Sequence, residues 1–191
     1  VMKRAWFVFG RFNPPTIGHK KMLDQLKKLA GHEDFMIWPT WSQGKAKDPL
    51  DHLTKLGWIK KMFPEYVNNI KSDKQLRTLP FVLQHLMMEN YTDVVIVCGS
   101  DRTKDFAFNV KWNRKETGEG KAYYAFDTVT IDSTGLERDP DSDGTSGLSA
   151  SLMRDAAKNT KTRDFLGGIG DLLNTDDALE LMADVRKGLG L

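Results

Sequence analysis

The sequence predicts an α/β fold in which a doubly wound, mostly parallel sheet of five strands carries helices on both faces and is followed by a C-terminal helical extension. Two observations support this prediction. Short apolar runs alternate with segments of helical period about ten to fifteen residues long, as in βαβ units. The run VVIV at residues 94–97 is continuously apolar and β-branched, which is typical of a parallel strand buried on both faces.

Each expected element follows from its local pattern. The five strands are expected at residues 5–9, 34–39, 66–70, 92–98 and 128–131. Helical spacing of apolar residues follows them at residues 19–30, 49–63, 76–89, from residue 102 onward, and after a cap at Ser149 or Ser146. Residues 1–160 are expected to form one domain, and residues 161–191 two short helices, separated near Asn174, that pack on it.

Composition excludes several classes of protein. The 28 basic and 26 acidic residues leave a net charge of only +2, which argues against non-specific binding of nucleic acid. One cysteine, Cys98, allows no disulfide within the chain, so a reducing compartment is favoured. We find no apolar run near the roughly 20 residues of a membrane span, and no signal-peptide core. We expect a soluble, cytoplasmic protein without membrane contacts.

The stretch GRFNPPTIGH at residues 10–19 joins the first strand to the first helix. Such a turn places backbone N–H groups and the positive end of a helix dipole at the carboxyl edge of the sheet, where anions bind. His19 lies three residues before Met22, on the inward stripe of the helix, so its imidazole is expected to point over the sheet edge into that anion site.

Three polar turns follow carboxyl ends of the expected strands, at residues 10–19, 99–102 and 133–154. Ligands of open parallel sheets bind at this edge, where the strand order reverses. The three turns are therefore predicted to form one site.

The motifs resemble those of the nucleotidylyltransferase superfamily. Residues 10–19 are similar to its Gly-x-Phe-x-Pro turn followed by Thr-x-Gly-His, residues 148–154 (LSASLMR) to its Ile-Ser-x-Thr-x-x-Arg motif, and residues 99–101 to its Gly-x-Asp. The resemblance spans residues 4–158, with departures at Leu148 and Ser151. It implies a Rossmann-like sheet and in-line attack of a substrate phosphate on the α-phosphate of a nucleoside triphosphate, with loss of pyrophosphate and no covalent intermediate.

The resemblance also assigns roles. His19 would donate a hydrogen bond to the α-phosphate, Thr16 would contact phosphate through its hydroxyl, and Arg154 would reach the same oxygens, so these three are the expected catalytic residues. Mg²⁺ would arrive with the triphosphate, because no carboxylate cage for a metal is visible. The expected nucleotide-binding residues are Gly10, Arg11, Phe12, Asn13, Gly18, Gly99, Asp101, Arg102, Ser149 and Ser151.

The substrates follow from finer similarity. Arg11 and Thr16 resemble the adenylyl-transferring branch, which favours ATP and nicotinamide mononucleotide as substrates and NAD as product. A cytidylyltransferase acting on CTP and a small phosphorylated alcohol, and a non-catalytic nucleotide-binding or structural module, stay open as alternatives. Residues 137–154 look like uncharacterised members from large bacteriophages, which would place the protein in a host cytoplasm. A homo-oligomer is compatible with the sequence.

Two loops hold further candidates. Lys45 and Lys47 follow the second strand and are expected near a phosphate or the acceptor, and Trp41 is expected either to pack or to stack on a ring of the acceptor. Residues 139–144 (DPDSDG) imitate the start of a calcium loop, but Ala150 stands where that loop needs its bidentate glutamate. We interpret this run as an acidic, mobile flap that discriminates between substrates.

Overall fold

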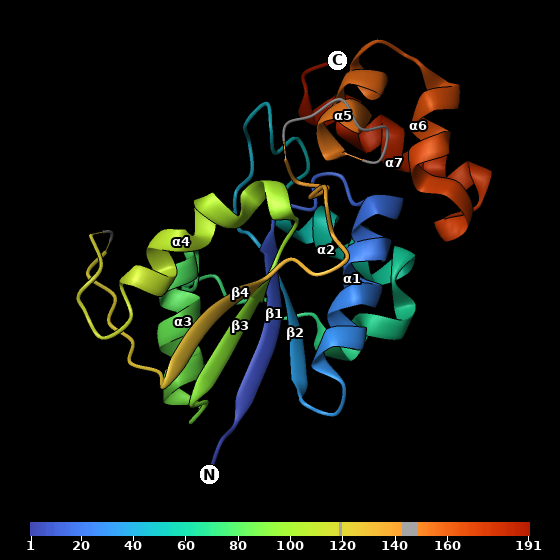
Figure 1. Ribbon diagram of the computed structural model, residues 1–191. Coiled ribbons are helices and arrows are strands. Elements are labelled where there is room, and N and C mark those ends of the chain that lie inside the picture. The colour runs from blue at the N-terminus through green and yellow to red at the C-terminus, as the bar shows by residue number, and fades with distance from the viewer. Residues whose placement is uncertain (119, 143–148) are drawn as a thin grey trace.

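The computed structural model describes residues 1–118, 120–142 and 149–191, and across these residues the sheet has four strands in the order β2–β1–β3–β4 (Figure 1). The strands are β1 (Arg4–Gly10), β2 (Asp34–Pro39), β3 (Asp93–Val97) and β4 (Thr128–Asp132). Every pairing between them is parallel. The predicted α/β fold is confirmed, but the prediction of five strands is wrong.

The missing strand is the run at residues 66–70. It lies in the 3₁₀ helix η1 (Pro64–Asn69), whose first position is a proline with the backbone angle that a helix start needs. Val67 is 40% exposed. Ile70 alone forms a bridge to the sheet, opposite Ile37. The run therefore crosses the edge of β2 without joining it as a strand.

Helices cover both faces of the sheet. On one face, α1 (Ile17–Ala30) and α2 (His52–Met62) bury apolar residues such as Leu23 and Ile59 against β1 and β2. On the other face lie α3 (Leu79–Met88) and α4 (Thr103–Lys111), which Figure 1 shows beside β3 and β4. A second apolar core lies between these two helices and the sheet.

The C-terminal helices α5 (Ala150–Lys158), α6 (Thr162–Ile169) and α7 (Thr175–Gly188) pack on one another, and α6 also contacts α1 (Figure 1). A short 3₁₀ turn, η3 (Gly170–Leu172), separates α6 from α7. The side chain of Asn174 caps α7 by accepting a hydrogen bond from the Asp177 N–H at 2.8 Å. None of the helices that the structure describes is both long and apolar enough to cross a lipid bilayer.

The strand order places the ends of β1 and β3 side by side. From β1 the chain moves to β2 on one side, and it later returns to pair β3 on the other side of β1. The crevice outside such a reversal is the usual ligand site of an open α/β sheet. It lies between Gly10, at the end of β1, and Gly99, just after β3.

Candidate functional site at the carboxyl edge of the sheet

The turn after β1 holds His19 in one orientation. Thr16 is the N-cap of α1, and its hydroxyl oxygen accepts hydrogen bonds from the Gly18 and His19 N–H groups at 3.1 and 3.4 Å. In return, the Thr16 N–H donates to Nδ1 of His19 at 3.0 Å. This reciprocal cap fixes the start of the helix and one of the two ring nitrogens of His19.

Two more contacts fix the imidazole of His19. The ring of Phe12 stacks on it with 4.4 Å between the ring centroids. The backbone angle φ of Phe12 is 51°, in the left-handed region. Nε2 of His19 lies 2.7 Å from Oδ1 of Asp141. The histidine is fully buried. As expected, its imidazole is directed over the sheet edge, but its partner there is a carboxylate of the chain.

The first and last motifs are joined through Asn13 and Arg154. The Asn13 side chain donates to the Leu50 carbonyl at 3.0 Å and accepts from the Leu50 N–H at 2.9 Å. Its amide is therefore occupied by the loop before α2. Its backbone carbonyl accepts a hydrogen bond from Nη1 of Arg154 at 2.9 Å, which brings Arg154 to the turn.

Ser149 is the N-cap of α5, one of the two caps expected. Its hydroxyl accepts from the Leu152 N–H at 3.3 Å and lies 3.2 Å from the hydroxyl of Ser151. The alternative cap, Ser146, falls at residues 143–148, which lie outside the described residues. The Ala150 N–H donates to the Pro140 carbonyl at 2.8 Å. The start of α5 is thus tied to residues 139–142, which we call segment 139–142.

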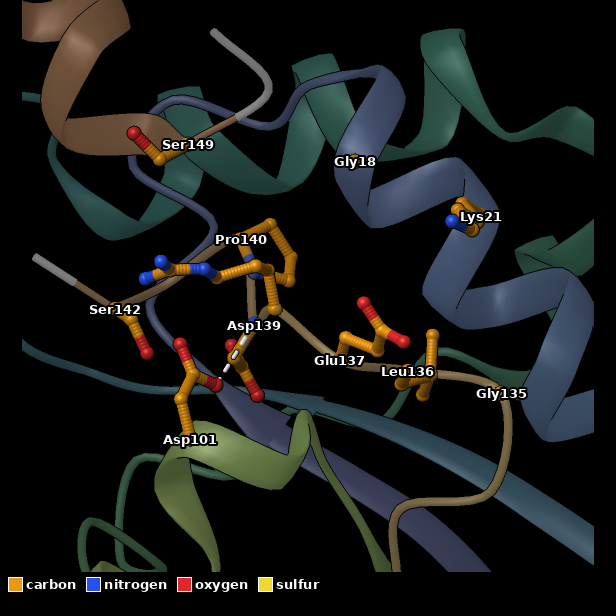
Figure 2. A pocket seen from close by; sticks show the side chains of 11 residues that line it. Gly18, Lys21, Asp101, Gly135, Leu136, Glu137, Asp139, Pro140, Ser142 and Ser149 are labelled. Carbon is orange, nitrogen blue, oxygen red and sulfur yellow. Dashed lines mark hydrogen bonds between the residues drawn. The ribbon is translucent and has the colours of Figure 1, made fainter. Parts of the chain in front are cut away.

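Segment 139–142 also binds the turn after β3. Asp139 accepts a hydrogen bond from the Gly99 N–H at 2.9 Å, and its own N–H donates to Asp101 at 3.0 Å (dashed in Figure 2). A Cβ at Gly99 would overlap the backbone of Asp139. Arg102 lies with Nη1 3.7 Å from the same carboxylate. The three predicted turns therefore meet at one place, as the sequence indicated.

The interpretation of this acidic run as a flap is wrong for its described part. The side chains of Asp139 and Asp141 are only 3% and 2% exposed. Burial and the neighbouring Asp141 raise the pKa of Asp139 above its ordinary value. Burial would also raise the pKa of Asp141, but its interaction with His19, the charge of Arg102 and the hydrogen bond from the Phe12 N–H outweigh burial and lower that pKa to about 2. These carboxylates are packed into the site.

Two cavities flank segment 139–142. The first, which we call the helix-side cavity, has a volume of about 390 Å³ and lies between α1, the start of α5 and residues 135–140. Figure 2 shows Asp101 and Ser149 on opposite sides of Pro140 in this cavity. Of the predicted nucleotide-binding residues, Gly18, Asp101 and Ser149 line it.

The second, the loop-side cavity, has a volume of about 620 Å³ and lies beyond the end of β1. Gly10, Lys47 and Asp141 contribute to its wall. Its basic lining residues are Arg11, Lys47, Arg77, Arg102 and Arg138. Arg77 and Arg138 were not among the candidates from the sequence, because nothing in their local pattern separates them from solvated surface residues.

Not every predicted residue reaches a cavity. Lys45 is exposed and lines neither cavity, and its carbonyl accepts a hydrogen bond from the Asp48 N–H. Trp41 stacks on His52 at 3.7 Å between centroids, with the guanidinium of Arg77 5.5 Å from its ring centre. Of the two alternatives for Trp41, the structure therefore favours packing.

Lys55 is a buried cation that sequence reasoning missed, because α2 looked like an ordinary amphipathic helix. Its ammonium donates to the Thr40 carbonyl at 2.6 Å, under the wall of the loop-side cavity. Burial lowers the pKa of Lys55 to about 8, against the opposing effect of Asp48 and Asp141. A lysine at position 55 thus adds positive charge beneath a cavity that is already basic.

Among the described residues, no three His, Cys, Asp or Glu side chains gather as a metal site would require. The carboxylate of Asp139, which borders the helix-side cavity, is engaged with the Gly99 N–H. Mg²⁺ commonly binds through substrate phosphates with one or two protein carboxylates. Asp101 lines both cavities, and its Oδ1 accepts the hydrogen bond of the Asp139 N–H.

Comparisons with known proteins agree with this architecture. A probable nicotinate-nucleotide adenylyltransferase from Sulfurimonas denitrificans is 29% identical over 98 residues, which are 48% of this chain and 53% of that protein. The chain thus spans about half the length of this curated relative. A solved structure, a bifunctional NMN adenylyltransferase/ADP ribose pyrophosphatase from Francisella tularensis, matches with a TM-score of 0.54 and 12% identity, covering 100% of this chain and 53% of that one.

The family comparison covers the whole site, from β1 into the first two turns of α5. The sequence model of the cytidylyltransferase-like family matches residues 7–155, from β1 through Arg154. It therefore includes all three turns that meet at the crevice between β1 and β3. The chain belongs to the cytidylyltransferase-like family.

Proposed function

We propose that this chain is a nucleotidyltransferase that transfers the nucleoside monophosphate of ATP to nicotinamide mononucleotide, or to a closely related acceptor phosphate, with release of pyrophosphate. One observation carries the proposal. His19 Nε2 and the Phe12 N–H both contact one carboxylate oxygen of Asp141, at 2.7 and 3.2 Å. Donors that hold a carboxylate oxygen at this point suit a phosphate oxygen equally well.

The proposed step balances without an added co-reactant. A phosphate oxygen of the acceptor attacks the α-phosphorus of the triphosphate, and the bond to the bridging oxygen of pyrophosphate breaks. Charge moves toward the leaving group, so the chain must position two anions and neutralise them. His19 would donate a hydrogen bond to the α-phosphate from Nε2, while Thr16 holds the ring through Nδ1.

Each of the two cavities would hold one of the two substrates. The helix-side cavity, lined by Gly18 and Ser149, would hold the nucleotide, and Ser151 and Arg154, which follow Ser149 in α5, would contact its outer phosphates. The loop-side cavity would hold the acceptor, whose phosphate is attracted by Arg11, Lys47 and the other cations of its wall. Mg²⁺ bound with the triphosphate would neutralise phosphate charge, and Asp101 is the residue we assign to it.

Adenylyl transfer is favoured by the relative from Sulfurimonas denitrificans, which is named as an adenylyltransferase. The test is pyrophosphate release from the purified chain with Mg²⁺, each of ATP, CTP, GTP and UTP, and each of four acceptors: nicotinamide mononucleotide, nicotinate mononucleotide, choline phosphate and glycerol phosphate. We expect release with ATP and a pyridine mononucleotide. His32→Ala, at an exposed histidine that lines neither the helix-side nor the loop-side cavity, is the matched control for His19→Ala.

Other outcomes would replace the proposal. Release with CTP and a phosphorylated alcohol alone would make the chain a cytidylyltransferase. Tight nucleotide binding without release, for every pair, would make it a binding module that retains the fold. In either case the adenylyl assignment is lost.

A further inference from the structure

The Nε2 donor of His19 is used within the chain. A neutral imidazole has one N–H and one acceptor nitrogen. Nδ1 faces two groups of Thr16, the backbone N–H at 3.0 Å and the hydroxyl oxygen at 3.2 Å, and it accepts the hydrogen bond of the backbone N–H. The proton therefore lies on Nε2, which donates to Asp141 Oδ1 at 2.7 Å. Thr16 and the stacked ring of Phe12 hold the imidazole without Asp141, whose carboxylate takes up the Nε2 donor.

Asp141 sits where an anionic ligand would sit. Its Oδ1 also accepts the Phe12 N–H at 3.2 Å, in the turn whose backbone N–H groups are the expected anion site. Its Oδ2 packs against the backbone of Gly10, so that a Cβ at position 10 would overlap this oxygen. That oxygen is buried and has no hydrogen-bond partner among the residues that the structure describes. A buried carboxylate oxygen without a partner costs free energy, while the contacts of Oδ1 and the charge of Arg102 favour the ionised carboxylate at this place.

Segment 139–142 also separates the two cavities. Asp139 and Pro140 line the helix-side cavity, Asp141 lines the loop-side cavity, and Ser142 lines both. In-line transfer requires reacting atoms to approach within about 3–3.5 Å. While Asp141 is hydrogen-bonded to His19, segment 139–142 lies between the two cavities in which the proposed substrates would bind.

We propose that Asp141 is an internal competitor of the nucleotide: its carboxylate occupies the position of a nucleotide phosphate oxygen on His19 and Phe12, and binding of the nucleotide displaces it. Two anions cannot share these donors, because they repel each other at close range. Displacement of Asp141 joins the two cavities, so the acceptor reaches the α-phosphate only after the nucleotide has entered. The identity of the displacing anion rests on the proposed function.

The test measures binding and needs no turnover. The probe is inorganic triphosphate, titrated calorimetrically into the wild-type chain, Asp141→Ala and Asp105→Asn. Asp105→Asn is the charge-matched control, because Asp105 lines the same cavity with a 64% exposed side chain and does not contact His19. We expect Asp141→Ala to bind triphosphate roughly tenfold more tightly or better, since it removes a competing state, and Asp105→Asn to change affinity less than about threefold.

Two further measurements make the interpretation specific. In a His19→Ala background, the gain from Asp141→Ala should shrink, because one of the two shared donors is gone and only the Phe12 N–H is left to compete for. Asp141→Asn, which keeps the shape and removes the charge, should give an intermediate gain and serves if the alanine variant does not fold. Equal or weaker triphosphate binding by folded Asp141 variants, or an equal gain in Asp105→Asn, would overturn the inference.

This result is separable from that of the transferase assay. If the wild-type chain turns over but Asp141→Ala binds triphosphate no better, the competitor role falls and the proposed function stands. If no substrate pair gives pyrophosphate but Asp141→Ala binds triphosphate more tightly, the transferase falls and the competitor role stands.

Discussion

Nη1 of Arg154 donates a hydrogen bond to the carbonyl oxygen of Asn13 at 2.9 Å, across 141 positions of sequence. The contact joins the first turn of the site to α5. Asn13 is in turn held by Leu50 through both of its amide atoms. Arg154 is thus positioned by the backbone of Asn13, a buried residue whose side chain makes two hydrogen bonds to Leu50. Such a fixed partner suits a guanidinium that must meet phosphate oxygens in one geometry.

Arg154→Ala is expected to lower kcat/KM for pyrophosphate release by about a hundredfold or more, as the loss of one charged donor to a transition state does. Arg154→Lys should recover only part of that loss, since an ammonium cannot keep the Asn13 contact and bind phosphate in the same planar geometry. Steady-state kinetics of both variants measure this. Arg163→Ala, an exposed arginine of α6, is the control. Activity of Arg154→Ala within twofold of wild type would remove Arg154 from the site.

Gly99→Ala is expected to destabilise the fold by about 1–3 kcal/mol, because its Cβ would overlap the backbone of Asp139 and force segment 139–142 away from β3. Urea unfolding measures the change in free energy. Gly167→Ala in α6 is the matched control: nothing lies within 4 Å of its Cβ, and alanine favours a helix. Equal stability of the two variants would show that the contact between Gly99 and Asp139 is not tight in solution.

Lys55 should make stability rise with pH above neutrality. Its folded pKa is about 8, below the ordinary 10.5, so between these values the unfolded chain binds more protons than the folded one. Stability therefore increases as pH rises through this window. Relative to Lys55→Met, we expect the wild type to gain about 2 kcal/mol of unfolding free energy between pH 8 and pH 10.

The comparison with Lys55→Met is needed because other groups of the chain titrate in the same pH range and also change the stability. Burial raises the pKa of Cys98 to about 12, which acts in the opposite direction over part of the same range. Lys60→Met, an exposed lysine of the same helix, should follow the wild type. A wild-type curve parallel to that of Lys55→Met would mean that Lys55 keeps an ordinary pKa.

The sequence predicted most of the fold because the relevant patterns are local. The run at 94–97 became the fully buried β3, and Ser149 and Asn174 cap the helices expected after them. Residues 66–70 were wrongly predicted to be a strand because their apolar members resemble a short strand. The deciding feature is Pro64, which starts a 3₁₀ helix. A five-residue run offers too few positions to separate the two periods.

The candidate site could be located from the sequence but not completed. Parallel strands end at one edge, so three polar turns at strand ends had to meet. Asp141 was missed because an acidic loop is usually solvated, and its contact with His19 spans 122 positions. Only tertiary packing, with Gly10 leaving room for the carboxylate, decides that this aspartate is buried. The roles assigned to these residues stay predictions until they are tested by substitution.

The role of His19 at the α-phosphate is tested by the transfer of labelled nucleotide from α-phosphate-labelled ATP to nicotinamide mononucleotide by the wild type, His19→Ala and His32→Ala. Removal of the donor to the α-phosphate should lower kcat by about 10²–10³ with a small change in KM, while His32→Ala keeps wild-type rates. Thermal unfolding should show that both variants are folded. Undiminished kcat in folded His19→Ala would contradict the central claim that the turn at residues 10–19 handles the α-phosphate.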